Sequence, residues 1–165
     1  MIATRYAKIV MIFGLALFGL QVSVDNMIDY PSNFAFVQHV LSMDTVFPGN
    51  TLKWRAITAP SMHHAAYIAI ILAEMLTGLC FLVCAGKLLM NVRAPAATFH
   101  RAKALGVVAA TIGFATWFIG FMVVGGEWFG MWQSPTWNGQ QSAFRFYMTL
   151  LAVLIFLMQR DDELT

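Results

Sequence analysis

Four apolar runs, separated by more polar segments, make up most of the chain. We predict membrane-spanning helices at about residues 6–28, 63–89, 104–124 and 142–158. A helix of about 20 apolar residues is long enough to cross the hydrocarbon core of a bilayer. The pattern therefore predicts an all-α membrane protein, a four-transmembrane-helix bundle in which residues 1–165 form a single integral membrane domain.

Two of the connections between these spans carry patterns of their own. Within residues 30–60, a short helix that begins near Pro31 is predicted to lie in the membrane interface. Its apolar face would hold Phe34, Val37, Val40 and Leu41. Residues 47–55 carry turn residues and show no helical period. We expect the 30–60 segment and a Trp-rich loop within residues 123–146 to form a cap on the outer face of the bundle.

Composition agrees with a membrane protein. The chain is 59% hydrophobic and 11% charged, whereas soluble domains are about 45–50% apolar and about 25% charged. A net charge of +2 is too small to indicate nucleic acid as a partner. Cys80 and Cys84 lie inside an apolar run, which argues against a disulfide framework. The first apolar run lacks a small-residue cleavage site, so we interpret it as an uncleaved helix.

The Lys and Arg residues predict the orientation of the chain. Seven of them fall on one side of the four predicted spans: Arg5, Lys8, Lys87, Arg93, Arg101, Lys103 and Arg160. Three fall on the other: Lys53, Arg55 and Arg145. The side that is richer in Lys and Arg usually faces the cytoplasm. Both termini are therefore expected in the cytoplasm, and residues 159–165 are expected to form a short solvated tail.

Three stretches carry a family resemblance. They are SMDTVFPGN (Ser42–Asn50), KWRAI (Lys53–Ile57) and EWFGMWQSPTWNGQQSAFRF (Glu127–Phe146). Together they resemble the bacterial family described as predicted small integral membrane proteins, domain of unknown function 2165. The resemblance covers essentially the whole chain. It implies a multi-pass protein of the bacterial cytoplasmic (inner) membrane with four helices, and it implies no particular reaction.

Glu74 is the most unusual residue of the predicted spans. It shares one helix face with His63, Tyr67 and Thr77, and it lies near the bilayer midplane, where a charge is costly. One interpretation is a proton or cation relay. The other is a structural carboxyl group that is hydrogen-bonded to a neighbouring helix.

Three charged residues are expected near the outer membrane face. Arg145 could bind an anion or form a gated ion pair with Glu127 or Asp25, but a structural clamp between helices is favoured, with Glu127 as the partner. Glu127 ends a stripe of small residues that recurs every seven positions, at Gly106, Gly113 and Gly120. Such a stripe favours close packing between helices in lipid.

The histidines and tryptophans allow further interpretations. His63, His64 and His39 are weak candidates for metal or haem ligands, because no H-x-x-x-H or C-x-x-C spacing is present. Interfacial hydrogen bonding is the simpler interpretation, and no cofactor or metal is expected. Trp128, Trp132 and Trp137 could line a quinone or lipid pocket, or form an aromatic belt at headgroup depth.

The sequence leaves three functions open. The leading hypothesis is a non-catalytic accessory or scaffolding subunit that binds a larger membrane complex, or a protein that binds membrane lipid. The second is a small transporter or proton- or ion-conducting protein that uses Glu74 and Arg145. The third is a haem- or quinone-linked redox subunit that uses His63 or His64. A non-catalytic protein is favoured over an enzyme.

Overall fold

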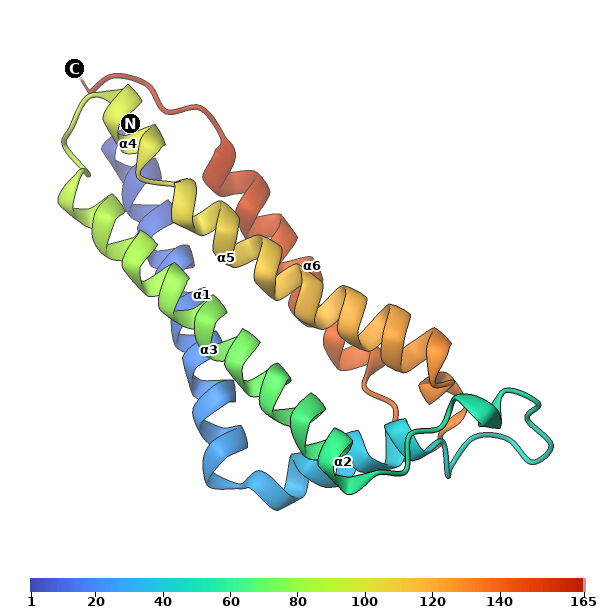
Figure 1. The fold of residues 1–165 in the computed structure, drawn as a ribbon. Coiled ribbons are helices and arrows are strands. Elements are labelled where there is room, and N and C mark those ends of the chain that lie inside the picture. Colours follow the sequence, from blue (N-terminus) through green and yellow to red (C-terminus); the bar gives the residue numbers. More distant parts are fainter. Residues whose placement is uncertain (165) are drawn as a thin grey trace.

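Four long helices lie side by side in the computed structural model, which describes residues 1–164 (Figure 1). The first is α1 (Ile2–Ile28) and the second is α3 (Pro60–Met90). The third is built from α4 (Ala96–Arg101), α5 (Ala104–Phe114) and η2 (Ala115–Trp128), and the fourth is α6 (Gln140–Met158). All four are long and apolar enough to cross a membrane, and residues 1–164 contain no strand. The prediction of an all-α membrane protein with four spans is confirmed.

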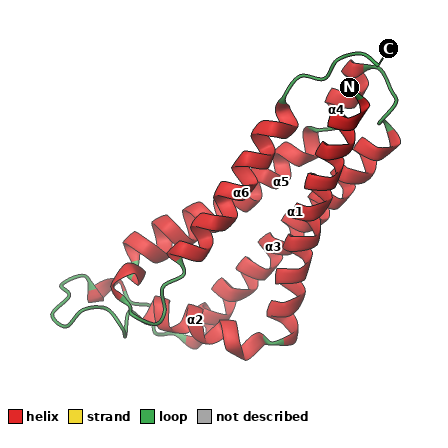
Figure 2. Cartoon of the chain, turned by 180° about the vertical axis from the view of Figure 1, so that it is seen from behind, coloured by secondary structure: helices red, strands yellow, loops and turns green. Residues whose placement is uncertain are grey.

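The bundle has two different ends. Both termini lie at one end, beside α4, and we call it the termini end (Figure 1). At the opposite end, the loop end, α2 (Tyr30–Ser42) lies across the helices (Figure 2). The loop that follows α2, with the short η1 (Lys53–Arg55), and the loop that contains η3 (Met131–Gln133) also lie at this end.

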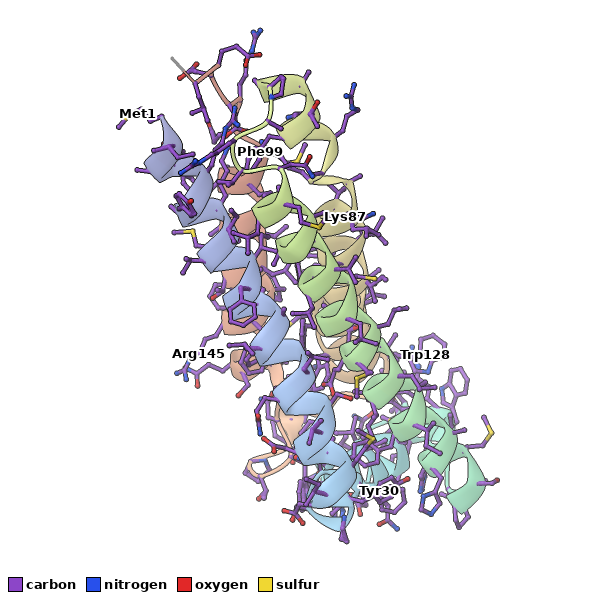
Figure 3. All side chains as sticks on the ribbon, turned by 90° about the vertical axis from the view of Figure 1, so that its left-hand side faces the viewer. Met1, Tyr30, Lys87, Phe99, Trp128 and Arg145 are labelled. Atoms are coloured by element: carbon purple, nitrogen blue, oxygen red, sulfur yellow. The ribbon has the colours of Figure 1, made fainter. Side chains whose placement is uncertain are left out.

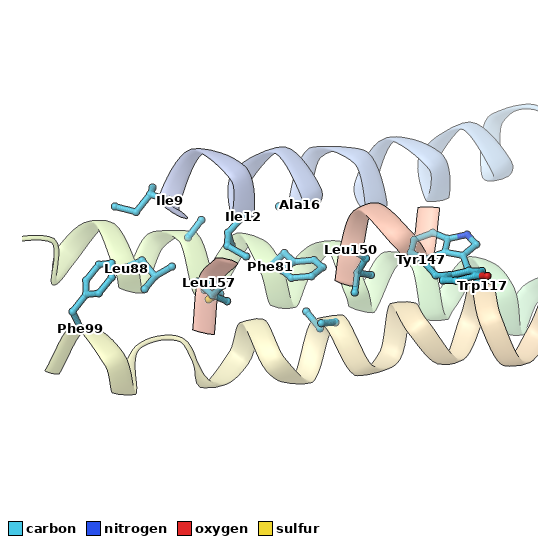
Figure 4. Close-up of a cluster of buried hydrophobic side chains, with 14 of the residues drawn as sticks. Ile9, Ile12, Ala16, Phe81, Leu88, Phe99, Trp117, Tyr147, Leu150 and Leu157 are labelled. Atoms are coloured by element: carbon cyan, nitrogen blue, oxygen red, sulfur yellow. The ribbon is translucent and has the colours of Figure 1, made fainter. Parts of the chain in front are cut away.

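The main apolar core runs along the bundle from Phe99, near the termini end, to Tyr147 and Trp117 (Figure 4). Ile12, Phe81 and Leu88 are almost fully buried there, between helices α1 and α3 and the remaining helices. Other large apolar side chains, such as Val10 and Leu72, are exposed on the outside of the bundle. Lipid tails are as apolar as these side chains, so the outward faces need no protein cover in a membrane.

Helices α1 and α3 approach closely at a pair of glycines. A Cβ atom on Gly78 would lie 2.7 Å from the backbone nitrogen of Leu20, and one on Gly19 would lie 3.0 Å from Gly78 Cα. Two helix backbones come this near only where side chains are absent. The sequence pattern did not identify this crossing, because each helix contributes a single glycine rather than a repeated stripe.

The predicted glycine stripe is only half correct. Gly106 and Gly113 are buried, and Cβ atoms on them would meet Leu157 at 2.8 Å and Leu150 at 2.6 Å. Gly120 and Glu127 are exposed. They lie in η2, which is a π-helix, and its i→i+5 hydrogen bonds give more residues per turn than the α-helix that the seven-residue spacing assumed.

The predicted cap forms at the loop end from the 30–60 segment and the Trp-rich loop. Val40, Met43 and Val46 from the first segment pack with Phe129 and Met131 from the second. The Gln133 side-chain oxygen accepts hydrogen bonds of 2.9 Å from the Phe47 backbone N–H and from the Asn50 side-chain amide. The two segments therefore form one folded layer at the loop end.

Candidate functional site

Glu74, at the middle of α3, belongs to a largely buried polar network that is centred on Asn26. Its Oε2 accepts a hydrogen bond of 2.8 Å from the side-chain amide of Asn26 in α1. Asn26 Oδ1 in turn accepts a bond of 2.7 Å from the amide of Asn33 in α2. The Tyr67 hydroxyl donates to the Asn26 backbone carbonyl at 3.1 Å. The network therefore joins helices α1, α2 and α3.

The chain order explains how these groups meet. Asn26 lies in the last turn of α1, and a short turn at Asp29 leads directly into α2, which turns back beneath the bundle. Pro31 lies in the first turn of α2, where its lack of a backbone N–H costs nothing. Asn33 is thereby placed under the end of α1. The predicted face of α3 is confirmed, because His63, Tyr67, Glu74 and Thr77 are all buried.

A cavity of about 250 Å³ lies beside this network. Polar groups of Glu74, Asn26, Asn33 and Tyr67 line one part of it, and aromatic rings line much of the rest. The aromatic lining consists of Phe36, Trp117, Phe121 and Phe146. A second cavity of about 210 Å³ shares Phe36 and Phe121 with the first, and its lining is almost entirely apolar. A cavity with polar groups on one side thus adjoins an apolar one in the loop-end half of the bundle.

Glu74 retains hydrogen-bonding capacity toward the cavity. Its Oε2 is bonded to Asn26, whereas no hydrogen bond within residues 1–164 reaches its Oε1. A carboxyl oxygen can accept more than one hydrogen bond. The cavity can therefore hold a group that donates hydrogen bonds or carries positive charge, and aromatic rings favour a cation as well.

The polar groups do not continue from Glu74 toward the termini end. Beyond Thr77, the interior is closed by Phe81, Ile12 and Leu88, each no more than 1% exposed. The Thr77 hydroxyl bonds within its own helix, to the Ala73 carbonyl at 2.7 Å. The cavity is therefore a pocket of the loop-end half of the bundle.

The three candidate histidines lie apart from this cavity. His63 is buried and its Nε2 lies 2.7 Å from the Ile57 carbonyl oxygen, while His64 stacks on Phe34 with ring centroids 4.2 Å apart. His39 pairs with Asp44 at 2.7 Å. In the described part of the chain, no three His, Cys, Asp or Glu side chains lie close enough to hold a metal ion.

The predicted outer clamp does not form. Neither Glu127 nor Asp25 pairs with Arg145 among residues 1–164, and all three side chains are exposed. Asp25 instead accepts a hydrogen bond of 2.8 Å from Gln21 on the outward face of α1. Arg145 projects away from the bundle in Figure 3. The clamp prediction is wrong because similar depth does not fix the direction in which each side chain points around its helix.

The tryptophans of the Trp-rich loop have different surroundings. Trp137 stacks on His39 with ring centroids 4.5 Å apart and is half-buried. Trp128 and Trp132 are each 48% exposed at the loop end. The Arg55 guanidinium lies over the Trp128 ring at 4.4 Å. None of these three tryptophans lines the Glu74 cavity; the tryptophan that does is Trp117.

A second buried charged cluster, at the termini end, was not predicted. Asp161 accepts hydrogen bonds from Lys8, at 2.8 Å, and from Lys103. Both lysines also donate to the Gln159 carbonyl, and Arg5 donates to the Asp162 carbonyl at 3.0 Å. The prediction of a solvated tail is therefore wrong for Asp161, whose side chain is buried, and the backbone carbonyls of Gln159 and Asp162 are bound at the helix ends. The side chains of Gln159, Arg160 and Asp162 are exposed.

Asp161 is held in its charged form by this cluster. Burial raises the pKa of its carboxyl group, but hydrogen bonds and positive charge from Lys103 and Lys8 outweigh that effect and leave the pKa below its usual value. The side chain is only 3% exposed. Nothing in the spacing of the tail indicated this contact, because it joins residues more than 150 positions apart.

Comparison with known proteins agrees with the fold. A family model described as predicted small integral membrane protein (DUF2165) matches residues 4–160. The match spans nearly the whole chain, so the chain belongs to this family. No curated protein and no solved structure matches it.

Proposed function

We propose that this member of the small integral membrane protein family is a non-catalytic protein that binds an amphipathic small molecule in the Glu74 cavity. The observation that carries the proposal is the pairing of a carboxyl group with an adjoining apolar compartment. The head of the ligand would be a cation or a hydrogen-bond donor, held by Glu74, and its apolar part would lie against Phe36 and Phe121. Ligand sites of this kind combine apolar walls with few polar groups.

A binding role is favoured over conduction. A proton or ion path would need polar groups along the bundle, whereas Phe81, Ile12 and Leu88 separate Glu74 from the charged cluster at the termini end. A role as an accessory subunit is compatible with binding, because the ligand could be a lipid that the protein presents to a larger membrane complex.

The proposed location is the bacterial cytoplasmic membrane with both termini in the cytoplasm. The basic residues support it, because the ends of the helices place seven Lys and Arg residues at the termini end and three toward the loop end. The Glu74 cavity would then lie in the outer half of the membrane. Thiols introduced at Asn50 and Gln140 should react with an impermeant reagent in intact cells, and one introduced at Ala97 should not.

Three probes of equal chain length test the ligand: dodecylamine, dodecanol and dodecanoic acid. Thermal unfolding in detergent should show stabilisation by dodecylamine and little by dodecanoic acid. Glu74→Gln should keep the fold, because its amide oxygen still accepts from Asn26, and should lose the preference for the amine. Asp25→Asn, which changes an exposed acid, is the matched control. Equal stabilisation by all three probes, or an unchanged preference in Glu74→Gln, would contradict the proposal.

A further inference from the structure

A groove on the outside of the bundle, between α1 and α6, ends at Arg145. Its volume is about 490 Å³, and it is open to the surroundings of the bundle. One face of α1 provides Met11, Gly14, Leu15 and Phe18, and one face of α6 provides Arg145, Phe146, Thr149 and Val153. The spacing on each helix is that of a single face. Apart from Arg145 and Thr149, the lining is apolar.

Arg145 has no anionic partner among the residues that the structure describes. Neither of the acids at similar depth pairs with it, and no side-chain hydrogen bond of its guanidinium is present within residues 1–164. It is the sixth residue of α6, about 7.5 Å along the helix from its loop end. A cation at that depth is costly unless it reaches an anion or the headgroup layer.

The groove has the dimensions of one lipid chain within one leaflet. Arg145 and Val153 are eight residues apart, which corresponds to about 12 Å along the helix. One leaflet contributes about half of a hydrocarbon core of about 30 Å. The groove has free space at Gly14, where an added Cβ would meet no atom within 4 Å.

We propose that this groove binds a phospholipid of the leaflet at the loop end, with its phosphate on Arg145 and one acyl chain along Gly14. The planar guanidinium donates two parallel hydrogen bonds to a phosphate, which makes Arg well suited to this anion. The positive charge of Arg145 favours the phosphate. The apolar lining, which extends from Phe146 toward Met11 and Val153, accommodates the acyl chain. The site is separate from the Glu74 cavity and does not depend on the function proposed for it, because Phe146 stands between the two.

Native mass spectrometry in detergent, with two lipids of identical acyl chains, tests the proposal. Phosphatidylglycerol carries the phosphate and diacylglycerol lacks it. The wild-type protein should bind phosphatidylglycerol about tenfold or more tightly than diacylglycerol, and Arg145→Gln should remove that difference. Gly14→Leu should weaken binding of both lipids, because its side chain fills the groove.

Matched variants distinguish lipid binding in this groove from effects of the substitutions on the protein as a whole. Gly86→Leu is the control for Gly14→Leu, since Gly86 is also exposed and also has open space around its Cβ, but lies outside the groove. Glu74→Gln should bind phosphatidylglycerol as the wild type does. The proposal is overturned if the wild type binds both lipids equally, if Arg145→Gln keeps the preference, or if Gly14→Leu binds as well as Gly86→Leu.

Discussion

At the termini end, Asp161 is enclosed by Lys8 and Lys103, and both of its oxygens are used by protein groups. In the loop-end half of the bundle, Glu74 is buried to a similar degree but is bonded to the protein through one oxygen, and it borders a cavity. Both are buried carboxyl groups, and their surroundings give them different roles. A fully partnered group stabilises the fold, whereas a partly partnered one beside a cavity can also bind a ligand.

The two ends also differ in what closes them. At the termini end, Gln159 and Asp161 of the tail contact the helix ends directly, and an open hollow lined in part by Asp161 remains beside the tail. The loop end is covered by a layer of α2 and two loops, and cavities remain beneath it.

The largest effect should come from breaking the charged cluster. Asp161→Asn leaves the buried Lys8 and Lys103 without a counter-charge and should lower the free energy of unfolding by about 3–5 kcal/mol. Thermal unfolding in detergent measures it. Asp162→Asn is the control, because Asp162 is exposed and contributes its backbone carbonyl rather than its side chain. Equal losses in both variants would mean that the Asp161 carboxylate has no special role.

The close crossing of α1 and α3 lies between the two ends of the bundle, and substitutions there test how tightly the two helices pack. Gly78→Ala should destabilise the protein by about 1–3 kcal/mol, because the added Cβ would lie 2.7 Å from the Leu20 backbone nitrogen and forces the helices apart. Gly14→Ala should leave stability unchanged or raise it slightly, since its Cβ would enter open space. Similar melting temperatures for the two variants would contradict this packing.

Substitution of Glu74 should affect stability less than substitution of Asp161. Glu74→Leu removes the acceptor for the Asn26 amide and should cost about 1–3 kcal/mol. Glu74→Gln keeps an acceptor and should cost less. Urea or thermal unfolding of both variants distinguishes them, and a larger loss for Glu74→Gln than for Asp161→Asn would reverse the comparison between the two ends.

Lowering the pH should reduce the free energy of unfolding through Asp161, by less than the substitutions above. Because the pKa of Asp161 is lowered in the folded protein, its ionised form stabilises the fold above the ordinary Asp pKa of about 3.9. This stabilisation is lost as the pH falls from there through the lowered pKa. Melting temperatures between pH 7 and pH 3 should therefore fall more steeply at the acid end for the wild type than for Asp161→Asn. Parallel curves would show that Asp161 does not contribute.

Sequence reasoning succeeded where one helix or one short segment carries the information. The spans, the amphipathic α2 and the buried face of α3 with Glu74 follow from apolar periodicity along the chain. The outer cap followed from the density of turn and aromatic residues in two connections. The spans, α2 and the buried face of α3 depend on neighbouring residues and on the surrounding lipid, so local patterns were sufficient for them.

Sequence reasoning failed where the partner lies far away in the chain. The clamp of Arg145 with Glu127 was inferred from depth alone, and the rotation of each helix about its axis decides whether such groups meet. Asn26 was not recognised as the partner of Glu74, although a polar residue in the last turn of a span was a usable signal. The contacts of Asp161 with Lys8 and Lys103 had no such signal.

The sequence by itself determined that this protein is a four-helix integral membrane protein with a carboxyl group on the buried face of its second span. Periodicity and length are read along one helix, and the bilayer sets both. Only the tertiary structure decided which groups surround that carboxyl, that a cavity adjoins it, and that Arg145 faces a lipid-exposed groove. Those features depend on how the helices rotate and cross, which is set by contacts between distant residues such as Gly19 and Gly78.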